Sequence, residues 1–243
     1  MRASIGRNEQ GSIPAFSVAF DQGLISVTGV VDRVDVYEHD RKTYFRVVDY
    51  KTGTKTFSPD ELPYGLGLQM LIYLFAIEKY LKQLGKNPVP SGVLYMPARD
   101  VSADAASGED EQSIHKKLRM KGIVLNEIDI IDAMDPAHAG KYIPVNFTNS
   151  GNIHGNSLPN IAYPQFFETA EHHIESMLEK MGRKIMDGCF PASPLDSGGQ
   201  SGCKYCDYTS VCPNSGTVVH RTVKKLSKDQ QLEILKGGSF DEQ

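Results

Sequence analysis

Three consecutive segments of the chain predict a strand, a helix and a second strand. Residues 43–51 (TYFRVVDYK) are rich in β-branched and aromatic side chains, which is typical of a strand. Residues 61–84 place apolar side chains at helical spacing, and Gly85 ends that helix. Residues 89–96 (VPSGVLYM) are almost all apolar, as in a strand at the centre of a sheet. We therefore expect an α/β fold, a mixed sheet flanked by helices, with these strands near its centre.

Further segments predict more strands and helices around this centre. Strands are expected at 15–20 and 24–32, where apolar and β-branched residues alternate, and helices at about 114–120, 126–134 and 163–187. The charged residues 38–42 predict a hairpin turn before the strand at 43–51. The apolar side of the long helix is expected to hold Phe167, Ile174, Met177, Leu178, Met181 and Ile185.

The length of 243 residues is enough for one domain with an appendage. We expect a core at 1–190 and a cysteine-rich segment with a basic tail at 191–243. Hydrophobic residues make up 40% and charged residues 23%, an ordinary soluble mixture. No apolar run approaches the length of a membrane span, and the first residues do not resemble a signal peptide. A cytoplasmic protein is expected.

A net charge of −4 excludes a cationic chain that coats nucleic acid along its whole surface. DNA would instead be bound through local patches and metal ions. The basic residues that suit this role are thinly spread, at Lys55, Lys116, Lys117, Arg119, Lys121, Lys224 and Lys225. We expect weak binding of DNA that falls as salt rises.

Two carboxylates and a lysine are candidates for a catalytic site. Asp49 and Lys51 alternate along one strand and so project from the same face, while Val48 and Tyr50 point to the other face, into the core. If Asp32 lies at the end of the neighbouring strand, two carboxylates and an ammonium group converge. Two such oxygen ligands suit Mg²⁺, which keeps several waters and binds phosphate oxygens. With Lys51 orienting the attacking water or stabilising the transition state, this chemistry cuts phosphodiester bonds.

The alternative is a solvated surface pair, because Asp-x-Lys is common on strands. The apolar neighbours of both acids favour the catalytic interpretation. Gln69 and Tyr73 lie one turn apart on one face of the following helix, which by itself is also consistent with an ordinary helix flank. Asp35 lies three residues past Asp32 and is expected to face the other way.

Three motifs follow one another along the chain: G-x-x-D at 29–32, V-D-Y-K at 48–51 and Q-x-x-x-Y at 69–73. Their order resembles the RecB-like PD-(D/E)XK nucleases, and in particular the C-terminal nuclease domain of AddB subunits of bacterial helicase–nucleases. The resemblance implies that Asp32 and Asp49 bind Mg²⁺ and that Lys51 is catalytic. It also implies that Gln69 and Tyr73 line the site.

Three cysteines, Cys203, Cys206 and Cys212, are separated by two and then five residues. Thiolates this close bind soft metals, and the spacing leaves zinc and an iron–sulfur cluster open, each normally with four ligands. Cys189 is expected to be a packed thiol at a helix end. The spacing also resembles the iron–sulfur staple of AddB-type nucleases, which implies a 4Fe–4S cluster. Its fourth ligand, with a His and a Glu of the family, is expected before Met1.

The resemblance spans Gly29 to Cys212 and includes MKGIVL at 120–125 and FPASP at 190–194. It implies a Mg²⁺-dependent DNA exonuclease domain that acts with an AddA-like subunit in recombinational repair, on the 5′-ended strand. One alternative is a stand-alone CRISPR-adaptation-type iron–sulfur exonuclease, which the MKG segment and the long insertions oppose. The other is a non-catalytic DNA-binding or scaffold module, which the intact acidic and lysine residues oppose.

Overall fold

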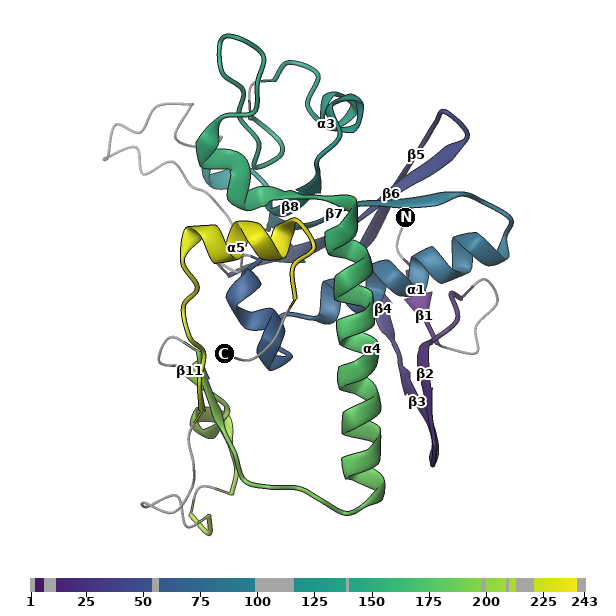
Figure 1. Ribbon diagram of the computed structural model, residues 1–243, viewed down its shortest axis with the longest axis vertical. Coiled ribbons are helices and arrows are strands. Elements are labelled where there is room, and N and C mark those ends of the chain that lie inside the picture. The colour runs from purple at the N-terminus through teal and green to yellow at the C-terminus, as the bar shows by residue number, and fades with distance from the viewer. Residues whose placement is uncertain are drawn as a thin grey trace.

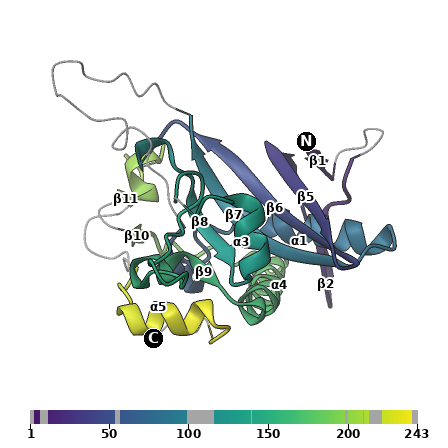
Figure 2. The ribbon, with the colours of Figure 1, turned by 90° about the horizontal axis from the view of Figure 1, so that it is seen from above.

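The computed structural model describes residues 3–6, 12–53, 57–98, 116–138, 140–197, 200–208, 210–212 and 221–239. Its centre is a five-stranded sheet in the order β5-β6-β7-β8-β9 (Figures 1 and 2). These strands are β5 (Arg33–His39), β6 (Lys42–Lys51), β7 (Pro88–Pro97), β8 (Lys121–Leu125) and β9 (Ile161–Ala162). The pairs β6–β7 and β8–β9 are parallel and the other two pairs are antiparallel. The predicted α/β class and mixed sheet are confirmed.

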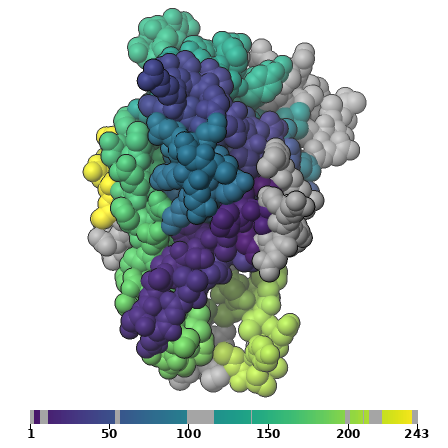
Figure 3. Space-filling model, turned by 90° about the vertical axis from the view of Figure 1, so that its right-hand side faces the viewer, coloured from purple at the N-terminus to yellow at the C-terminus, as the bar shows by residue number. Residues whose placement is uncertain are grey.

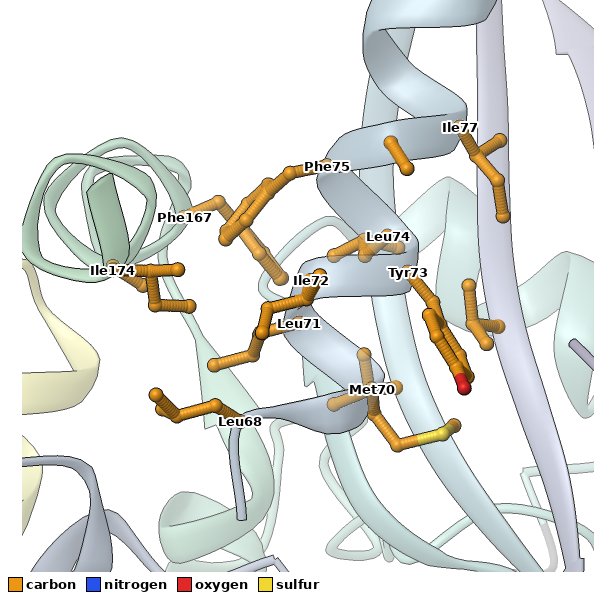
Figure 4. Packing of buried hydrophobic residues seen from close by; sticks show 14 of the residues in the cluster. Leu68, Met70, Leu71, Ile72, Tyr73, Leu74, Phe75, Ile77, Phe167 and Ile174 are labelled. Atoms are coloured by element: carbon orange, nitrogen blue, oxygen red, sulfur yellow. The ribbon is translucent and has the colours of Figure 1, made fainter. Parts of the chain in front are cut away.

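Helices cover both faces of this sheet. On one face, α1 (Gln69–Gln83) and α4 (Pro164–Met186) share a hydrophobic core with the strands. On the other face, α3 (Ile128–Met134) packs over a smaller apolar cluster. In Figure 4, Phe75 of α1 points toward α4, whereas Tyr73 points away from it. One side of α1 thus builds the core, and the side that carries Tyr73 faces other elements.

The N-terminal strands differ from the prediction. There are four of them: β1 (Ala3–Ile5), β2 (Phe16–Phe20), β3 (Gly23–Val27) and β4 (Gly29–Val31). The expected single strand at 24–32 is wrong, because β3 pairs with β2 and β4 pairs with β1. The β2–β3 hairpin lies along α4 (Figure 3), where a Cβ at Gly182 would lie 2.7 Å from the Phe20 ring. Only glycine allows this close contact.

The predicted hairpin turn before 43–51 is confirmed, but it joins β6 to β5. Asp40 and Arg41 form a two-residue turn with φ of 48° and 61°, the left-handed pair that such turns require. The expected helix at 61–84 is broken instead. A 3₁₀ helix, η1 (Pro59–Tyr64), comes first, then Gly65 and Gly67 adopt φ of 76° and 69°, and α1 begins at Gln69. Glycines in left-handed conformations end helices, so the long periodic segment becomes two elements.

The second half of the chain contains both confirmed and missed elements. The helices predicted at 126–134 and 163–187 are confirmed as α3 and α4. Of the helix expected at 114–120, the described part is helical at 116–118, and residues 114–115 lie outside the described residues; the strand β8 that follows was not predicted. On α4, Met181 and Ile185 are 44% and 53% exposed, so the apolar side predicted for this helix is only partly buried.

The C-terminal part forms short elements that the sequence did not predict. They are η2 (Gly155–Asn160), η3 (Gly202–Tyr205), α5 (Lys228–Leu235) and a small sheet of β10 (Leu195–Ser197), β11 (Gln200–Ser201) and β12 (Arg221–Thr222). Ile234 and Leu235 of α5 are buried in the main core, so the basic tail includes a docked helix. Within the described residues, no helix has the length and apolar character needed to cross a membrane.

Candidate active site

Asp49 and Lys51 lie at the end of β6, on the sheet face that α1 and α4 cover. Asp49 is only 8% exposed, and its Oδ2 atom is buried without accepting a hydrogen bond within the described residues. Lys51 Nζ lies 2.6 Å from that oxygen, so the expected common face is confirmed. The two groups form an ion pair, but the angles at their atoms are outside the range of a hydrogen bond. A buried carboxylate oxygen lacking donors is costly, and a cation beside it removes that cost.

The two residues expected on the opposite face behave differently. Val48 is fully buried against the α3 side of the sheet, as predicted. Tyr50 is 43% exposed, so the prediction that it enters the core is wrong. The reason is that β5 begins at Arg33, opposite Val48, and the last residues of β6 run past it.

Asp32 occupies the bend between β4 and β5, directly before the strand that pairs with β6. Its Oδ2 atom accepts a hydrogen bond from the backbone N–H of Tyr50 at 3.1 Å. The carboxylate of Asp32 therefore lies against the peptide that directly follows Asp49. The sequence predicted Asp32 at the end of the strand beside β6. It instead directly follows β4, which pairs with β1, and directly precedes β5, which pairs with β6.

Gln69 and Tyr73 approach the site from the first turns of α1. Gln69 Nε2 donates a hydrogen bond to the Tyr73 hydroxyl at 3.0 Å, and Tyr73 is buried. A Cβ placed on Gly29 would lie 2.3 Å from the same hydroxyl. Gly29 therefore lets β4 approach α1, which links the G-x-x-D segment to the Q-x-x-x-Y segment.

Asp35 faces away from these residues, as predicted. It forms ion pairs with Arg33 at 2.7 Å and with Arg46 at 2.9 Å. Burial alone would raise the pKa of Asp35, but the two guanidinium groups lower it below its usual range. Asp35 is a structural carboxylate on the α3 side of the sheet, where Met134 lines the same small pocket.

Three neighbours of Asp49 were not singled out for this site by the sequence. Asp49 pairs with Tyr95 across β6–β7, and Tyr95 pairs with Lys121 across β7–β8, so the three share one face. Burial, followed by the charges of Asp49 and Glu61, raises the pKa of Tyr95 to about 12. The carboxylate of Glu61, on η1, thus contributes negative charge to the surroundings of Tyr95. Strand pairing and the fold of η1 create this proximity, and no local pattern signals it.

The comparison with known proteins agrees with this geometry. The family model of the PD-(D/E)XK nuclease superfamily matches residues 3–213. The chain belongs to this superfamily. The nuclease also resembles the B subunits of enzymes named ATP-dependent helicase/deoxyribonuclease. It is 34% identical to the one from Clostridium kluyveri over 236 residues, 94% of this chain and 20% of that protein.

A second relative of the same name, from Bacillus anthracis, is 30% identical over 251 residues, 97% of this chain and 21% of that protein. The nuclease therefore spans about a fifth of the length of these curated relatives. The similarity to such subunits that the motifs predicted is confirmed.

The four cysteines of the nuclease all follow α4 along the chain. Cys203 is half-buried in η3, Cys206 is exposed, and Cys212 is half-buried. Cys189 is also exposed, just past α4, so its prediction as a packed thiol is wrong. A hydrogen bond of 3.1 Å from Ser197 Oγ to Glu61 Oε1 ties the start of this segment to η1.

The two expected metals fit the described residues differently. Mg²⁺ is commonly held by one or two carboxylates with waters and phosphate oxygens, and the buried Asp49 carboxylate, whose Oδ2 is ion-paired but accepts no hydrogen bond within the described residues, suits such a cation. An iron–sulfur cluster needs thiolates gathered around it. No three cysteine, histidine or carboxylate side chains of the described residues form a metal-binding group. As placed here, the three cysteines do not fit a cluster.

Proposed function

We propose that this nuclease is a Mg²⁺-dependent DNA exonuclease module of a bacterial ATP-dependent helicase–nuclease. The observation that carries the proposal is the buried Oδ2 of Asp49, which accepts no hydrogen bond within the described residues yet lies 2.6 Å from Lys51 Nζ. In a member of a nuclease superfamily, this arrangement supports a cation site beside a catalytic ammonium group.

Each residue of the site has a distinct role in this proposal. Asp32 and Asp49 would hold Mg²⁺, which when bound lowers the pKa of a water and offsets charge on the scissile phosphate. Lys51 orients the attacking water or stabilises the charge that develops on the phosphate. Gln69 fixes the hydroxyl of Tyr73 by their 3.0 Å hydrogen bond, and both line the site.

The proposal predicts cleavage that depends on the cation. The chain should degrade end-labelled single-stranded DNA with Mg²⁺ and leave it intact with EDTA, because the phosphate charge is then not offset. A gel assay over time measures this, with shortening from the ends indicating an exonuclease. Equal cleavage with EDTA would contradict the metal proposal, and DNA binding without any cleavage would favour the scaffold alternative.

The wider assembly is proposed from the relatives. The B subunits of ATP-dependent helicase/deoxyribonucleases match this chain along nearly its whole length. We infer that the chain works within such a subunit, together with an AddA-like partner. The assembly would resect the 5′-ended strand at cytoplasmic double-strand breaks during recombinational repair.

An iron–sulfur cluster is the second cofactor in the proposal. The spacing of Cys203, Cys206 and Cys212 supports it, whereas the described arrangement of these thiols does not. Both observations are accommodated if the fourth ligand lies outside this chain and gathers the other three. Three thiolates leave one iron open to solvent and oxygen.

We expect the isolated chain, purified in air, to contain little iron. The longer parent protein, purified without oxygen, should contain about four irons and four sulfides. Cys206→Ser in the parent should lose the iron, and Cys189→Ser, the matched control, should keep it. Iron and sulfide analysis measures this outcome. Stoichiometric zinc without iron in the parent would contradict the cluster.

A further inference from the structure

A cavity of about 710 Å³ lies between α4, the end of η1 and β12. Figure 1 shows α4 opposite the C-terminal segment that carries β11. Five basic or imidazole side chains line its two walls: His172, His173, Lys180, Lys184 and Arg221. No carboxylate is among the described residues that line it. In a chain of net charge −4, a cavity that gathers cations and excludes carboxylates favours an anionic ligand.

Helix α4 separates its charges between two sides. Its acidic side repeats every four residues, at Glu171, Glu175 and Glu179. Lys79 lies 3.3 Å and 2.8 Å from the first two of these carboxylates, and Arg183 lies 2.6 Å from the third. Lys180 and Lys184 are exposed on the cavity side, and neither is paired with a carboxylate in the described part of the chain. Their positive charges are therefore available to a ligand.

Apolar side chains alternate with these cations. Tyr64, Met177 and Met181 line the same cavity, and Met181 is 44% exposed although helical spacing predicted it on the apolar side. Basic side chains that alternate with apolar and aromatic ones suit single-stranded DNA, because its phosphates and its unstacked bases are both accessible. A duplex offers mainly phosphates, because its bases are stacked and paired.

The cavity is connected to the candidate active site through η1. Leu62 of η1 packs with Leu68 and Leu71 at the start of α1, where Gln69 lies. In the same 3₁₀ helix, the charge of Glu61 raises the pKa of Tyr95 beside Asp49, and Tyr64 lines the cavity. Three residues of a 3₁₀ helix span only about 6 Å, so one short element reaches from the site to the cavity. His173 adds a hydrogen bond of 3.2 Å to the backbone oxygen of Leu62, which fixes α4 against η1.

We propose that this cavity binds single-stranded DNA and leads the strand to or from the carboxylate site. Lys180 and Lys184 contact phosphates from one wall and Arg221 from the other, while Tyr64 and Met181 contact bases. This assignment rests on the nuclease function proposed above, and it adds a path for the substrate.

The test is the salt dependence of DNA binding by the whole chain in EDTA. Fluorescence anisotropy of labelled oligothymidine is measured over a range of NaCl concentrations for Lys180→Gln/Lys184→Gln. Losing two phosphate contacts should reduce the slope of log K against log salt by about 1.4 and weaken binding roughly twentyfold at about 0.1 M salt. Lys180→Arg/Lys184→Arg should retain the original slope.

The matched control is Lys82→Gln/Lys86→Gln, which removes the same charge at the distant end of α1, where both lysines are more than half exposed. It should leave the slope unchanged. The proposal would be overturned if the control reduced the slope of log K against log salt equally, or if the cavity variant did not reduce it. An equal or larger loss of duplex binding would overturn the single-strand assignment.

The same experiment distinguishes failure of the nuclease proposal from failure of the cavity proposal. Asp49→Ala should stop cleavage yet keep the original binding slope. Suppose that the unaltered chain cuts no DNA, but Lys180→Gln/Lys184→Gln still reduces the slope of log K against log salt. The cavity assignment then holds and the catalytic assignment fails. Circular dichroism of each variant establishes that it is folded.

Discussion

Lys51→Ala should slow DNA cleavage by this chain by about a thousandfold, the loss expected when a group that stabilises transition-state charge is removed. The ammonium group lies 2.6 Å from Asp49 Oδ2, so it reaches the place where a cation and a scissile phosphate would meet. Single-turnover rates on labelled single-stranded DNA with saturating Mg²⁺ measure the chemical step. Lys82→Ala, another ion-paired lysine but far from the site, should leave the rate unchanged.

Asp49→Ala should cause a similar loss of cleavage for a different reason. Without Asp49 the chain loses a ligand for Mg²⁺, so calorimetric titration should show weaker metal binding. Lys51→Ala should retain metal binding, because the lysine repels the cation. In the helicase–nuclease proposed above, both variants should keep ATP-driven unwinding. Loss of unwinding in either would mean that these residues are structural.

The catalytic strand was predictable because its signals are local. Alternation along a strand is enough to place Asp49 and Lys51 on one face, and a spacing of four on a helix brings Gln69 to the hydroxyl of Tyr73. The same alternation placed Asp35 on the other face. The face on which a side chain lies thus depends on one element alone, whereas its burial depends on neighbouring elements, as the exposed Tyr50 shows.

The missed features arise from packing between distant segments. The charge of Glu61 affects Tyr95 through the placement of η1, which the left-handed Gly65 and Gly67 separate from α1. Met181 has the helical spacing of a core residue, yet none of the described elements buries it. Helical periodicity predicts which face is apolar, but not whether another element packs against that face. The exposed methionine and the cavity beside it therefore required the tertiary structure.

One missed element did carry a local signal. Ser227 accepts a hydrogen bond from the backbone of Gln230, whose side chain accepts one from the Ser227 backbone. This capping box starts α5, whose last two residues, Ile234 and Leu235, are apolar and buried. The basic residues around it obscured the pattern, because charge alone suggested an unpacked tail.

Gly122→Ala should destabilise the fold by about 4 kcal/mol, because it combines backbone strain with a clash inside the central sheet. Gly122 has φ of 139°, a conformation that side chains rarely allow. A Cβ there would lie 2.1 Å from the backbone oxygen of Val93 and 3.1 Å from the Cα of Leu94. Both belong to β7, which is paired on both sides and cannot shift away. The glycine of the MKG segment is thus required by the close approach of β8 to β7.

Thermal unfolding followed by circular dichroism measures this effect, with the melting temperature expected to fall by roughly 12 °C for a chain of this size. Gly155→Ala is the matched control, because a Cβ there meets no atom within 4 Å and its φ is not left-handed. It should change the melting temperature by about 1 °C or less. Because Lys121 and Tyr95 are paired at the same end of β8, any folded Gly122→Ala chain should also cut DNA more slowly. Equal melting temperatures for the two variants would show that β7 and β8 can separate without cost, which contradicts the tight pairing of these central strands.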